Sequence, residues 1–382
     1  MSQTARTEVT TLPPNSTLLL ALELSNKTWR LGSTVSGRCG KPRMKTIDVT
    51  QPEQVAELVR MEIGMAKKRF HLPETAPVLS CYEAGRDGFW PHRLLESLGV
   101  ENLVIDSSSI EVKRRGRQAK TDRVDLGKLV QLLVRYSGGD GDAFRVAQVP
   151  TVEDEDARHL HRELGKLKQE RTRLGNEIKG HLATQGVKQF AMTKEVSEIR
   201  LWDGTGLQPL LQSRLERLLA RFKSTHEQIL ELDRKRQEEL KSSKDPRIEL
   251  VRTLMGLRAV GINGAWLLTM EFFSWRHFQN RRQVGSLAGL VGTPCNSGDG
   301  DRERGISKAG NSRVRVMMIE LAWCWLRFQP ESELSRWYQR RYGGGSKRTR
   351  RVGIVALARK LLVALWRYVD QGVVPEGALL KV

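Results

Sequence analysis

The sequence has few cysteines and no long apolar run, and each shortage excludes a class of protein. Its four cysteines, none in a C-x-x-C spacing, argue against a disulfide framework or a structural zinc site. No run of 18 apolar residues exists, so no transmembrane helix is predicted, and the N-terminal residues lack a signal-peptide pattern. Walker and G-x-G-x-x-G motifs are missing too, which leaves nucleotide-dependent chemistry without support. We therefore expect a cytoplasmic protein of a reducing compartment.

Positive charge, in contrast, is in excess and is concentrated in the last third of the chain. The 382 residues include 64 Lys and Arg against 44 Asp and Glu, which gives a net charge of +20. Residues 246–382 carry 23 basic and 10 acidic residues, a net charge of +13, whereas residues 1–150 carry +5 and residues 151–245 carry +2. Solubility does not require such an excess, so the last third predicts a polyanionic partner, most simply nucleic acid.

The hydrophobic pattern divides the chain into a polar tail and three regions. Residues 1–16 are expected to be a flexible tail. In residues 17–150 strands and helices alternate in the order ββαβαβ followed by a helix, which predicts an α/β domain with a mixed sheet. The first two strands are predicted to form a hairpin, because the turn residues Ser25, Asn26 and Lys27 separate them. Residues 151–245 hold two highly charged helical segments that we expect to form an antiparallel coiled-coil arm. Residues 246–382 are predicted to be mostly helical.

Two segments of the last region are polar and rich in glycine. Residues 293–312, TPCNSGDGDRERGISKAGNS, are predicted to form a loop of a length that usually marks function or disorder. Residues 343–351, GGGSKRTRR, are predicted to be a flexible basic linker. Asn311 or Ser312 should cap the helix that follows the loop. The aromatic side chains expected in the core are Trp323, Trp325 and Trp366.

Four acidic residues of the first region are candidates for binding a metal ion. Glu23 and Glu83 each end a buried strand, and Glu23 is conspicuous inside the apolar segment LLLALEL. Asp122 and Asp125 open a helix at spacing i, i+3, which places both on one helix face. Together they can supply oxygen ligands for Mg²⁺ and support phosphoryl transfer. The alternative is that Asp122 and Asp125 only complement the helix dipole.

Ser297 is the candidate nucleophile of the last region. Asn296 and Gly298 flank it, a setting that predicts an exposed and sharply turned hydroxyl. Five basic residues close in sequence could neutralise phosphates around it: Arg302, Arg304, Lys308, Arg313 and Arg315. On the sequence alone, a turn or capping serine is the more ordinary interpretation. No nearby histidine offers a base, so a hydrolase triad is not supported.

Several motifs in this chain resemble those of one known family. They are YEAGRDGF at 82–89, AKTDRVDLGKLV at 119–130, AGLVGTPCNSGDGDRERGISKAGNSRVR at 288–315 and VALARKLL at 355–362. In this order they resemble the DEDD-type transposases of the insertion sequence 110 family, which are bridge-RNA-guided serine recombinases. The resemblance extends over most of the chain. It implies a RuvC-like (ribonuclease-H-like) domain at 17–150, a coiled-coil arm at 151–245, and a helical transposase domain with the catalytic serine loop at 246–382.

The resemblance also implies roles for individual residues. Glu83, Asp122 and Asp125 match the second, third and fourth acids of the DEDD set, and Ser297 matches the nucleophilic serine. Glu23 stands where the family usually has Asp, so this ligand is one methylene longer. A second departure is RAVGIN at 258–263, where relatives tend to have a Pro-Gly-hydrophobic-Gly turn.

The activity implied by the resemblance is that of an RNA-guided DNA recombinase. An element-encoded bridge RNA would pair with donor and target DNA, Ser297 would form a covalent phosphoserine link to DNA, and the four acids would hold Mg²⁺ or Mn²⁺. The family also implies a homo-oligomer, a dimer of dimers, that is nucleoid-associated when bound to DNA and has no membrane partner. Besides the five basic residues after Ser297, the expected nucleic-acid contacts are Arg114, Arg115, Arg117 and Lys120.

Two other functions remain compatible with the residues. One is a RuvC-type metal-dependent nuclease that cuts DNA with water and uses Ser297 only as a turn residue. The other is a non-catalytic nucleic-acid-binding protein, for which Glu23 in place of Asp is the best argument. A covalent protein–DNA adduct distinguishes the recombinase from both.

Overall fold

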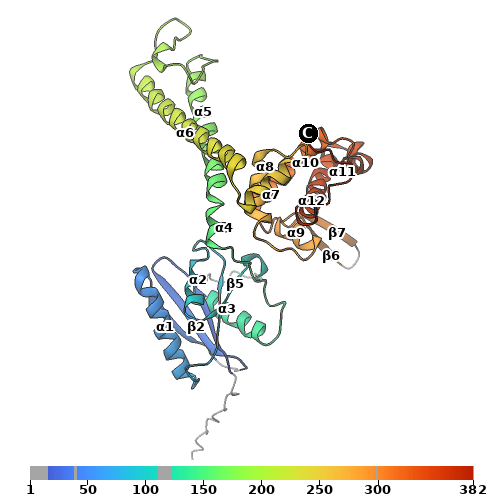
Figure 1. Cartoon of the computed structure of the whole chain (residues 1–382). Helices are drawn as coiled ribbons and strands as arrows, with labels where there is room; N and C mark the ends of the chain where they lie inside the picture. The colour runs from blue at the N-terminus through green and yellow to red at the C-terminus, as the bar shows by residue number, and fades with distance from the viewer. Residues whose placement is uncertain (1–15, 38–40, 111–121, 298–299, 382) are drawn as a thin grey trace, which may run out of the picture. The chain divides into compact units, whose positions relative to one another are not determined.

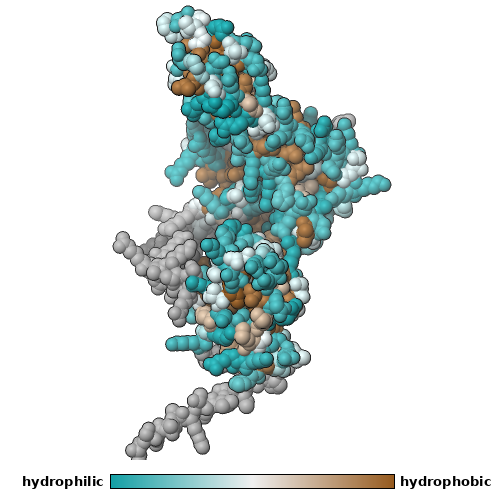
Figure 2. Space-filling view, turned by 90° about the vertical axis from the view of Figure 1, so that its left-hand side faces the viewer, coloured by the Kyte–Doolittle hydropathy of each residue, from teal (hydrophilic) through white to brown (hydrophobic). Residues whose placement is uncertain are grey.

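The computed structural model describes residues 16–37, 41–110, 122–297 and 300–381. The chain forms two compact units, Met1–Val149 and Pro150–Val382. None of the helices in these described ranges has both the length and the apolar character needed to cross a membrane. The face of the protein in Figure 2 is mostly hydrophilic, with apolar side chains exposed in small patches.

A five-stranded mixed sheet forms the centre of the first unit, in the order β3-β2-β1-β4-β5. β1, β2 and β3 pair antiparallel, whereas β4 is parallel to β1 and β5 is parallel to β4. The predicted hairpin between the first two strands and the mixed character of the sheet are confirmed. The strands are β1 (Leu18–Glu23), β2 (Thr28–Val35), β3 (Arg43–Asp48), β4 (Val78–Glu83) and β5 (Glu101–Ile105).

The third strand, β3, is absent from the predicted order. It lies at the edge of the sheet, and Ile47 is its only buried residue. An edge strand that is largely exposed does not need the run of apolar residues by which a buried strand is recognised. Its sequence, RMKTID, therefore carries little of the expected signal.

The two faces of the sheet pack against different helices (Figure 1). Alternate β1 residues such as Leu20 and Leu22 face α1 (Pro52–Arg69) and α2 (Trp90–Ser97). The residues between them, including Ala21, face α3 (Asp122–Ser137). The short helical turn η1 (Ser107–Ser109) follows β5. This division follows from the period-2 alternation of a strand that is buried on both sides.

The second unit begins with two long helices that pack side by side (Figure 1). After the short α4 (Val152–Asp156), α5 (His159–Ala183) runs antiparallel to α6 (Pro209–Ser242), with η2 (Val196–Glu198) in the connection. The ion pairs Lys168–Asp233 and Glu177–Arg214 show the antiparallel register. The two predicted helices are confirmed, while the coiled-coil arm stays a prediction.

A glycine inside α5 is explained by close packing of this helical pair. A Cβ on Gly175 would lie 3.4 Å from the ring of Phe222 on α6. Leu174, beside it, is fully buried and packs with Leu218 and Leu219 of α6. The glycine lowers helix propensity by about 1 kcal/mol relative to alanine, but here it lets the large Phe222 ring approach the helix backbone.

The remaining elements form a helical core with one β-hairpin. Trp325 of α10 is fully buried, and its Nε1 donates to Ser332 Oγ at 2.8 Å. The elements are α7 (Pro246–Met255), α8 (Ile262–Leu268), the π-helical η3 (Thr269–Phe273), α9 (Arg281–Leu287), β6 (Gly292–Ser297), β7 (Gly300–Ile306), α10 (Ser312–Phe328), α11 (Glu333–Tyr338), the π-helical η4 (Gln339–Gly343) and α12 (Lys347–Gln371).

Three predictions for this region are wrong or incomplete. The predicted loop at 293–312 contains the antiparallel hairpin of β6 and β7. The predicted basic linker at 343–351 instead enters α12, because Ser346 caps that helix and accepts a hydrogen bond from Thr349 N at 3.2 Å. Trp323 is 49% exposed, since its position i−2 from the buried Trp325 turns it away from the core.

The C-terminal segment packs back onto the helical core. Gly372 ends α12 in the left-handed conformation, with φ of 70°. Beyond it, Lys381 N donates to Gly256 O at 2.7 Å, and Arg258 N donates to Leu379 O at 3.0 Å. The buried Gln329 side chain holds Leu379 from both sides, donating to its carbonyl and accepting from its amide, each at 2.8 Å. We call residues 373–381 the C-terminal strap.

Candidate active site

Two of the four candidate acids end neighbouring parallel strands. Leu22 of β1 pairs with Tyr82 of β4, so Glu23 and Glu83 are the next residues along the two strands. Glu83 pairs with Ile105, which belongs to the apolar cluster on the α3 side of the sheet. Glu23 lies two residues after Ala21 of the same cluster and faces the same side. The structure therefore brings Glu23 and Glu83 to one edge and one face, as adjacent strand ends predict.

The two acids differ in their surroundings. Glu23 is half-buried, and its Oε2 atom is fully enclosed, whereas Glu83 is exposed. Cys81 lies two residues before Glu83 on the same face and is fully buried. Burial raises the pKa of the Cys81 thiol well above its usual range, so the sulfur stays protonated. Glu23 and Glu83 offer carboxylate oxygens at this edge, which suit a hard cation such as Mg²⁺.

The other two acids, Asp122 and Asp125, lie in the first turn of α3. Their side chains are outside the described residues. Leu126, next to Asp125, packs above Gly32, where an added Cβ would be 3.3 Å from Leu126 Cγ. Gly32 pairs with Ala21, which is two residues before Glu23. The backbone at the start of α3 is thus placed over the β1 strand on the face that carries Glu23 and Glu83.

A metal-binding cluster is not complete within the described side chains. Among them, no group of three His, Cys, Asp or Glu residues is close enough to hold a metal ion. Two of the four candidate ligands, Asp122 and Asp125, are outside that set. The predicted four-acid site therefore stays a prediction, supported by the shared face and strand edge of Glu23 and Glu83.

Ser297 occupies the last position of β6, where the hairpin turns. Its Cα partner across the hairpin is Gly300, and Arg302 and Arg304 are partners of Cys295 and Thr293. Because alternate residues of paired strands share a face, this register assigns Ser297, Arg302 and Arg304 to one face of the hairpin. The structure places the backbone of Ser297 at the end of a strand, and its predicted exposure stays a prediction.

The base of the hairpin is held by backbone hydrogen bonds and includes a closely packed glycine. Ser307 N donates to Val291 O at 2.8 Å, and Asn311 N donates to Leu287 O at 2.8 Å. Gly310 has φ of 99°, and a Cβ there would lie 2.2 Å from Leu287 O. Only glycine fits this left-handed position next to a carbonyl. The strands that carry Ser297 therefore leave the helical core from a closely packed base.

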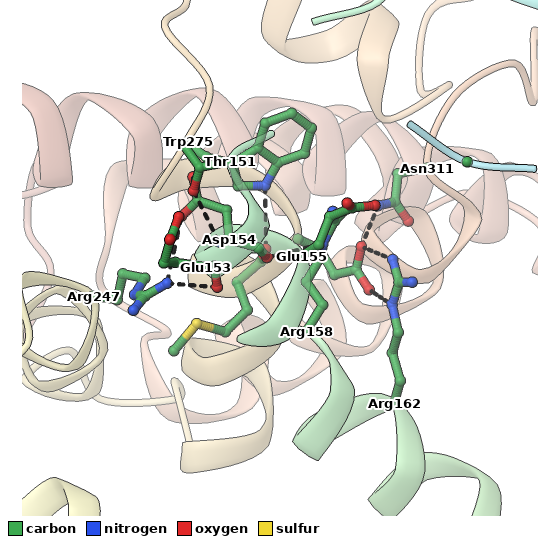
Figure 3. Close-up of polar contacts among 12 residues, drawn as sticks. Thr151, Glu153, Asp154, Glu155, Arg158, Arg162, Arg247, Trp275 and Asn311 are labelled. Atoms are coloured by element: carbon green, nitrogen blue, oxygen red, sulfur yellow. Dashed lines mark hydrogen bonds and ion pairs between the residues drawn. The ribbon is translucent and has the colours of Figure 1, made fainter. Parts of the chain in front are cut away.

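A buried carboxylate beside this base was not identified from the sequence (Figure 3). Glu271 of η3 is 1% exposed and accepts from Arg162 Nε at 2.6 Å, from His161 Nε2 at 3.0 Å and from Asn311 Nδ2 at 3.0 Å. Asn311 is also the predicted cap of α10, because its Oδ1 accepts from Arg313 N and Val314 N. The Glu271 carboxylate thus joins α5, η3 and Asn311, the cap of α10.

The surroundings of Glu271 keep it ionised. Burial alone would raise the pKa of its carboxyl, but hydrogen bonds from His161 and Arg162, together with their charges, hold the pKa far below its usual range. A sequence signal was present, since Glu271 is an acid inside the apolar segment LLTMEFF. The same reasoning that singled out Glu23 would have found it.

A second polar contact joins the start of the second unit to α7 (Figure 3). Arg247 Nη1 donates to Glu153 O at 2.9 Å and lies 3.6 Å from Asp154 Oδ1. Thr151 caps α4 by accepting from Asp154 N at 3.1 Å. This group fixes the entry into the helical unit and has no direct contact with the hairpin.

The predicted nucleic-acid contacts have different surroundings. Lys308 and Arg313 are exposed, whereas Arg315 donates to Lys308 O at 3.0 Å and so supports the hairpin base. Arg302 and Arg304 are placed by their backbone only. The remaining predicted contacts lie outside the described residues: Arg114, Arg115, Arg117 and Lys120.

Comparison with known proteins identifies the family. The model described as "Transposase IS116/IS110/IS902 family" matches residues 251–337. A putative transposase, y4rJ, of Sinorhizobium fredii (strain NBRC 101917 / NGR234) is 38% identical over 377 residues, which cover 95% of this chain and 94% of the relative. The chain belongs to the IS116/IS110/IS902 transposase family.

More distant relatives of this transposase have similar names. A probable family 20 transposase of Pseudomonas aeruginosa PAO1 is 26% identical over 315 residues, covering 80% of this chain and 88% of the relative. The transposase for insertion sequence element IS1111A of Coxiella burnetii is 27% identical over 240 residues, covering 62% of each chain. The residues matched by the family model contain the β6–β7 hairpin with Ser297, together with Glu271 and Asn311.

Proposed function

We propose that this transposase is a DNA recombinase in which Ser297 is the nucleophile. The observation that carries the proposal is the position of Ser297 at the turn of a hairpin whose same face bears Arg302 and Arg304. A hydroxyl at such a turn can approach a DNA phosphate, and the two guanidinium groups can stabilise the charge that develops on it. The closely packed base at Gly310 gives the hairpin a defined origin.

The proposed reaction exchanges one phosphate ester for another. The Ser297 oxygen forms a bond to phosphorus and loses its proton, and the bond from phosphorus to a deoxyribose oxygen breaks, with that oxygen taking up a proton. The phosphoserine ester bond that forms replaces the phosphodiester bond that breaks, so the number of ester bonds does not change. Attack by a DNA hydroxyl on phosphoserine then rejoins the strand and releases the serine. No ATP is needed, in keeping with the missing Walker motif.

The acidic edge of the sheet is proposed to hold Mg²⁺, or Mn²⁺. Glu23 and Glu83 supply carboxylate oxygens from adjacent strand ends. Asp122 and Asp125 would complete the set from the start of α3. A bound ion would neutralise charge on the phosphate. The strand order β3-β2-β1-β4-β5, with β4 and β5 parallel to β1, supports a RuvC-like domain.

The partners proposed are donor DNA, target DNA and an element-encoded bridge RNA. The net charge of +13 over residues 246–382 supports polyanion binding. Sequence specificity would then come largely from base pairing with the RNA. We propose a homo-oligomer, a dimer of dimers, in which the antiparallel helices α5 and α6 form a coiled-coil arm.

A denaturing gel with labelled DNA tests the nucleophile. The protein is incubated with Mg²⁺, the RNA encoded beside its gene, and labelled donor and target DNA. Labelled DNA should migrate with the wild-type protein and be lost in Ser297→Ala. The matched control is Ser307→Ala, which removes an exposed serine ten residues away and should leave the adduct intact.

Other outcomes favour the two alternative functions. Free cleavage products that persist in Ser297→Ala would assign the chain to a metal-dependent nuclease. DNA binding without any product, in both the wild type and Glu23→Asp, would favour a non-catalytic binding protein. Omitting the RNA tests the guide, because product formed equally well without it would contradict RNA guidance.

A further inference from the structure

A cavity of about 1020 Å³ lies at the base of the β6–β7 hairpin. Gly292 of β6 and Gly305 and Ile306 of β7 form one side, and α9, α11 and α12 form the others. Val373 and Val374 of the C-terminal strap complete it. We call this cavity the α12 groove. All of its lining residues belong to the second unit of the chain.

The α12 groove is strongly positive. Six basic residues line it: Arg281, Arg282, Lys308, Arg359, Lys360 and Arg367. All six are exposed, and none of them forms an ion pair with an acidic side chain of the described residues. Two acids also line it, but Glu333 is paired with Arg340. Six cations with a common opening favour a ligand that carries several negative charges.

The floor of the groove is apolar and includes one aromatic ring. Val355 and Val363 of α12 and Leu334 of α11 line it, and Val373 is 53% exposed. Lys360 Nζ lies 4.7 Å from the centre of the Trp337 ring. A single strand of nucleic acid combines phosphates, which bind cations, with unpaired bases, which bind apolar and aromatic surfaces. A duplex keeps its bases stacked inside, so it would leave this floor uncovered.

The position of the groove relative to Ser297 indicates which strand it receives. Ser297 is five residues along β6 from Gly292, which is about 17 Å at ~3.3 Å per residue. A stacked DNA strand advances about 3.4 Å per nucleotide, so this distance corresponds to about five nucleotides. A strand whose phosphate lies at the hairpin turn can therefore reach the groove without a break.

We propose that the α12 groove binds single-stranded DNA within about five nucleotides of the bond that Ser297 attacks. This inference rests on the proposed function, because the serine defines the reacting bond. Phosphates of the strand contact the basic residues of α12 and α9, and the bases lie on the apolar floor beside Trp337. The groove thus separates and holds the unpaired strand next to the reacting phosphate.

Equilibrium binding tests the groove without requiring any reaction. A fluorescein-labelled 15-nucleotide single-stranded DNA is titrated with protein that carries Ser297→Ala, and anisotropy is followed at several salt concentrations. Arg359→Gln with Arg367→Gln should weaken binding at least tenfold and reduce the slope of log K against log salt by about 1.4, at ~0.7 per lost phosphate contact. The control double variant, Arg327→Gln with Arg336→Gln, removes two exposed charges that do not line the groove and should bind normally.

Two further arms identify the ligand. RNA of the same sequence and the DNA duplex are titrated in parallel. The proposal would be overturned if the Arg359/Arg367 variant lost affinity only for RNA, or lost as much affinity for the duplex as for single-stranded DNA. Unchanged affinity of this variant for single-stranded DNA would overturn it as well. Circular dichroism and melting temperature verify folding, and Trp337→Leu provides a second groove variant that leaves all charges in place and should also weaken binding.

Single neutral methylphosphonate linkages locate the strand in the groove. They should weaken wild-type binding within about five nucleotides of the bond found in the adduct assay, and they should have no added effect in the Arg359/Arg367 variant. If a neutral linkage weakened binding equally in the wild type and in the Arg359/Arg367 variant, the proposed contact would be contradicted. If the serine adduct fails to form but the binding loss occurs, the proposed chemistry is wrong and the groove stands. If the adduct forms but the groove variants bind normally, the groove is wrong and the chemistry stands.

Discussion

Asn311 Nδ2 donates a 3.0 Å hydrogen bond to Oε2 of the buried Glu271. The same asparagine caps α10 through its Oδ1, and the same carboxylate binds Arg162 of α5. Asn311 lies five residues after Ile306, the end of β7, and directly before α10. One ionised side chain therefore contacts both α5 and Asn311, whose own amide N donates to Leu287 O at the base of the hairpin.

Replacing Glu271 should destabilise the second unit. Glu271→Gln removes the charge that Arg162 and His161 face, and breaking a buried pair at one partner costs about 3–5 kcal/mol. Urea unfolding followed by circular dichroism measures the loss. Glu320→Gln is the matched control, because Glu320 is an exposed acid of α10 and should change stability by less than ~0.5 kcal/mol. Equal midpoints for the two variants would contradict the structural role of Glu271.

The same carboxylate should make stability depend on acid pH. Burial alone would raise the pKa of Glu271, but hydrogen bonds from His161 and Arg162 hold it below 4.5, the ordinary value for a glutamate side chain. A lowered folded pKa gives stability that is fully present above the unfolded pKa and is lost as the pH falls below it. Urea midpoints measured from pH 7 to pH 3 should fall less steeply in Glu271→Gln than in the wild type. Parallel curves would show that Glu271 is not the group responsible.

Gly310 should tolerate no side chain. Its φ of 99° is unfavourable for alanine, and a Cβ would meet Leu287 O at 2.2 Å. We expect Gly310→Ala to lower the free energy of unfolding by roughly 2 kcal/mol or more and to lower the yield of covalent adduct. Gly305→Ala, where an added Cβ meets open space, should be nearly neutral in stability. Thermal melting of both variants compares them directly.

The two tryptophans of α10 should respond differently to the same change. Trp325→Phe removes the 2.8 Å hydrogen bond to Ser332 and leaves a cavity in the core, so we expect a loss of about 1–3 kcal/mol. Trp323→Phe changes a side chain that is 49% exposed and should cost less than ~0.5 kcal/mol. Chemical unfolding measures both. A larger loss at Trp323 would mean that this surface is buried in the assembled protein.

Glu83 offers a clean test of the acidic edge, because an exposed side chain can be changed with little effect on folding. Glu83→Gln should reduce adduct formation by about 100-fold or more if the carboxylate holds a metal ion, at an unchanged melting temperature. The matched control is Glu101→Gln, which removes an exposed acid from the first residue of β5. An adduct yield that stays at the wild-type level in Glu83→Gln would exclude this residue from the site.

The sequence was sufficient to predict those elements whose burial follows the period of a strand or a helix. The apolar segment LLLALE, a turn at Ser25–Lys27 and a second strand predicted the β1–β2 hairpin, and strand ends placed Glu23 beside Glu83. Asn311 was among the two expected caps of α10, since an amide side chain before an apolar helix is a strong signal. The long antiparallel helices followed from their spacing of leucines.

Local sequence patterns did not predict those features that depend on contacts between residues far apart in the sequence. The β6–β7 hairpin has charged and glycine residues at positions that single-sequence rules assign to loops, and cross-strand pairing overrides them. Ser346 caps α12, so the basic segment after it is helical. The three glycines that precede Ser346 made this segment resemble a flexible linker. The partners of Glu271 lie 110, 109 and 40 residues away in sequence, and no local pattern reports such distances.

The C-terminal strap has a consequence for the order in which the protein matures on the ribosome. The first unit is complete once residue 149 has been made, whereas the second needs Leu379 and Lys381 to satisfy Gln329, Arg258 and Gly256. At about 5–20 residues per second, the roughly 230 residues between take about 12–46 s to synthesise. The sheet with its acidic edge is therefore finished well before the hairpin and the α12 groove, which become stable only after Leu379 and Lys381 have been made.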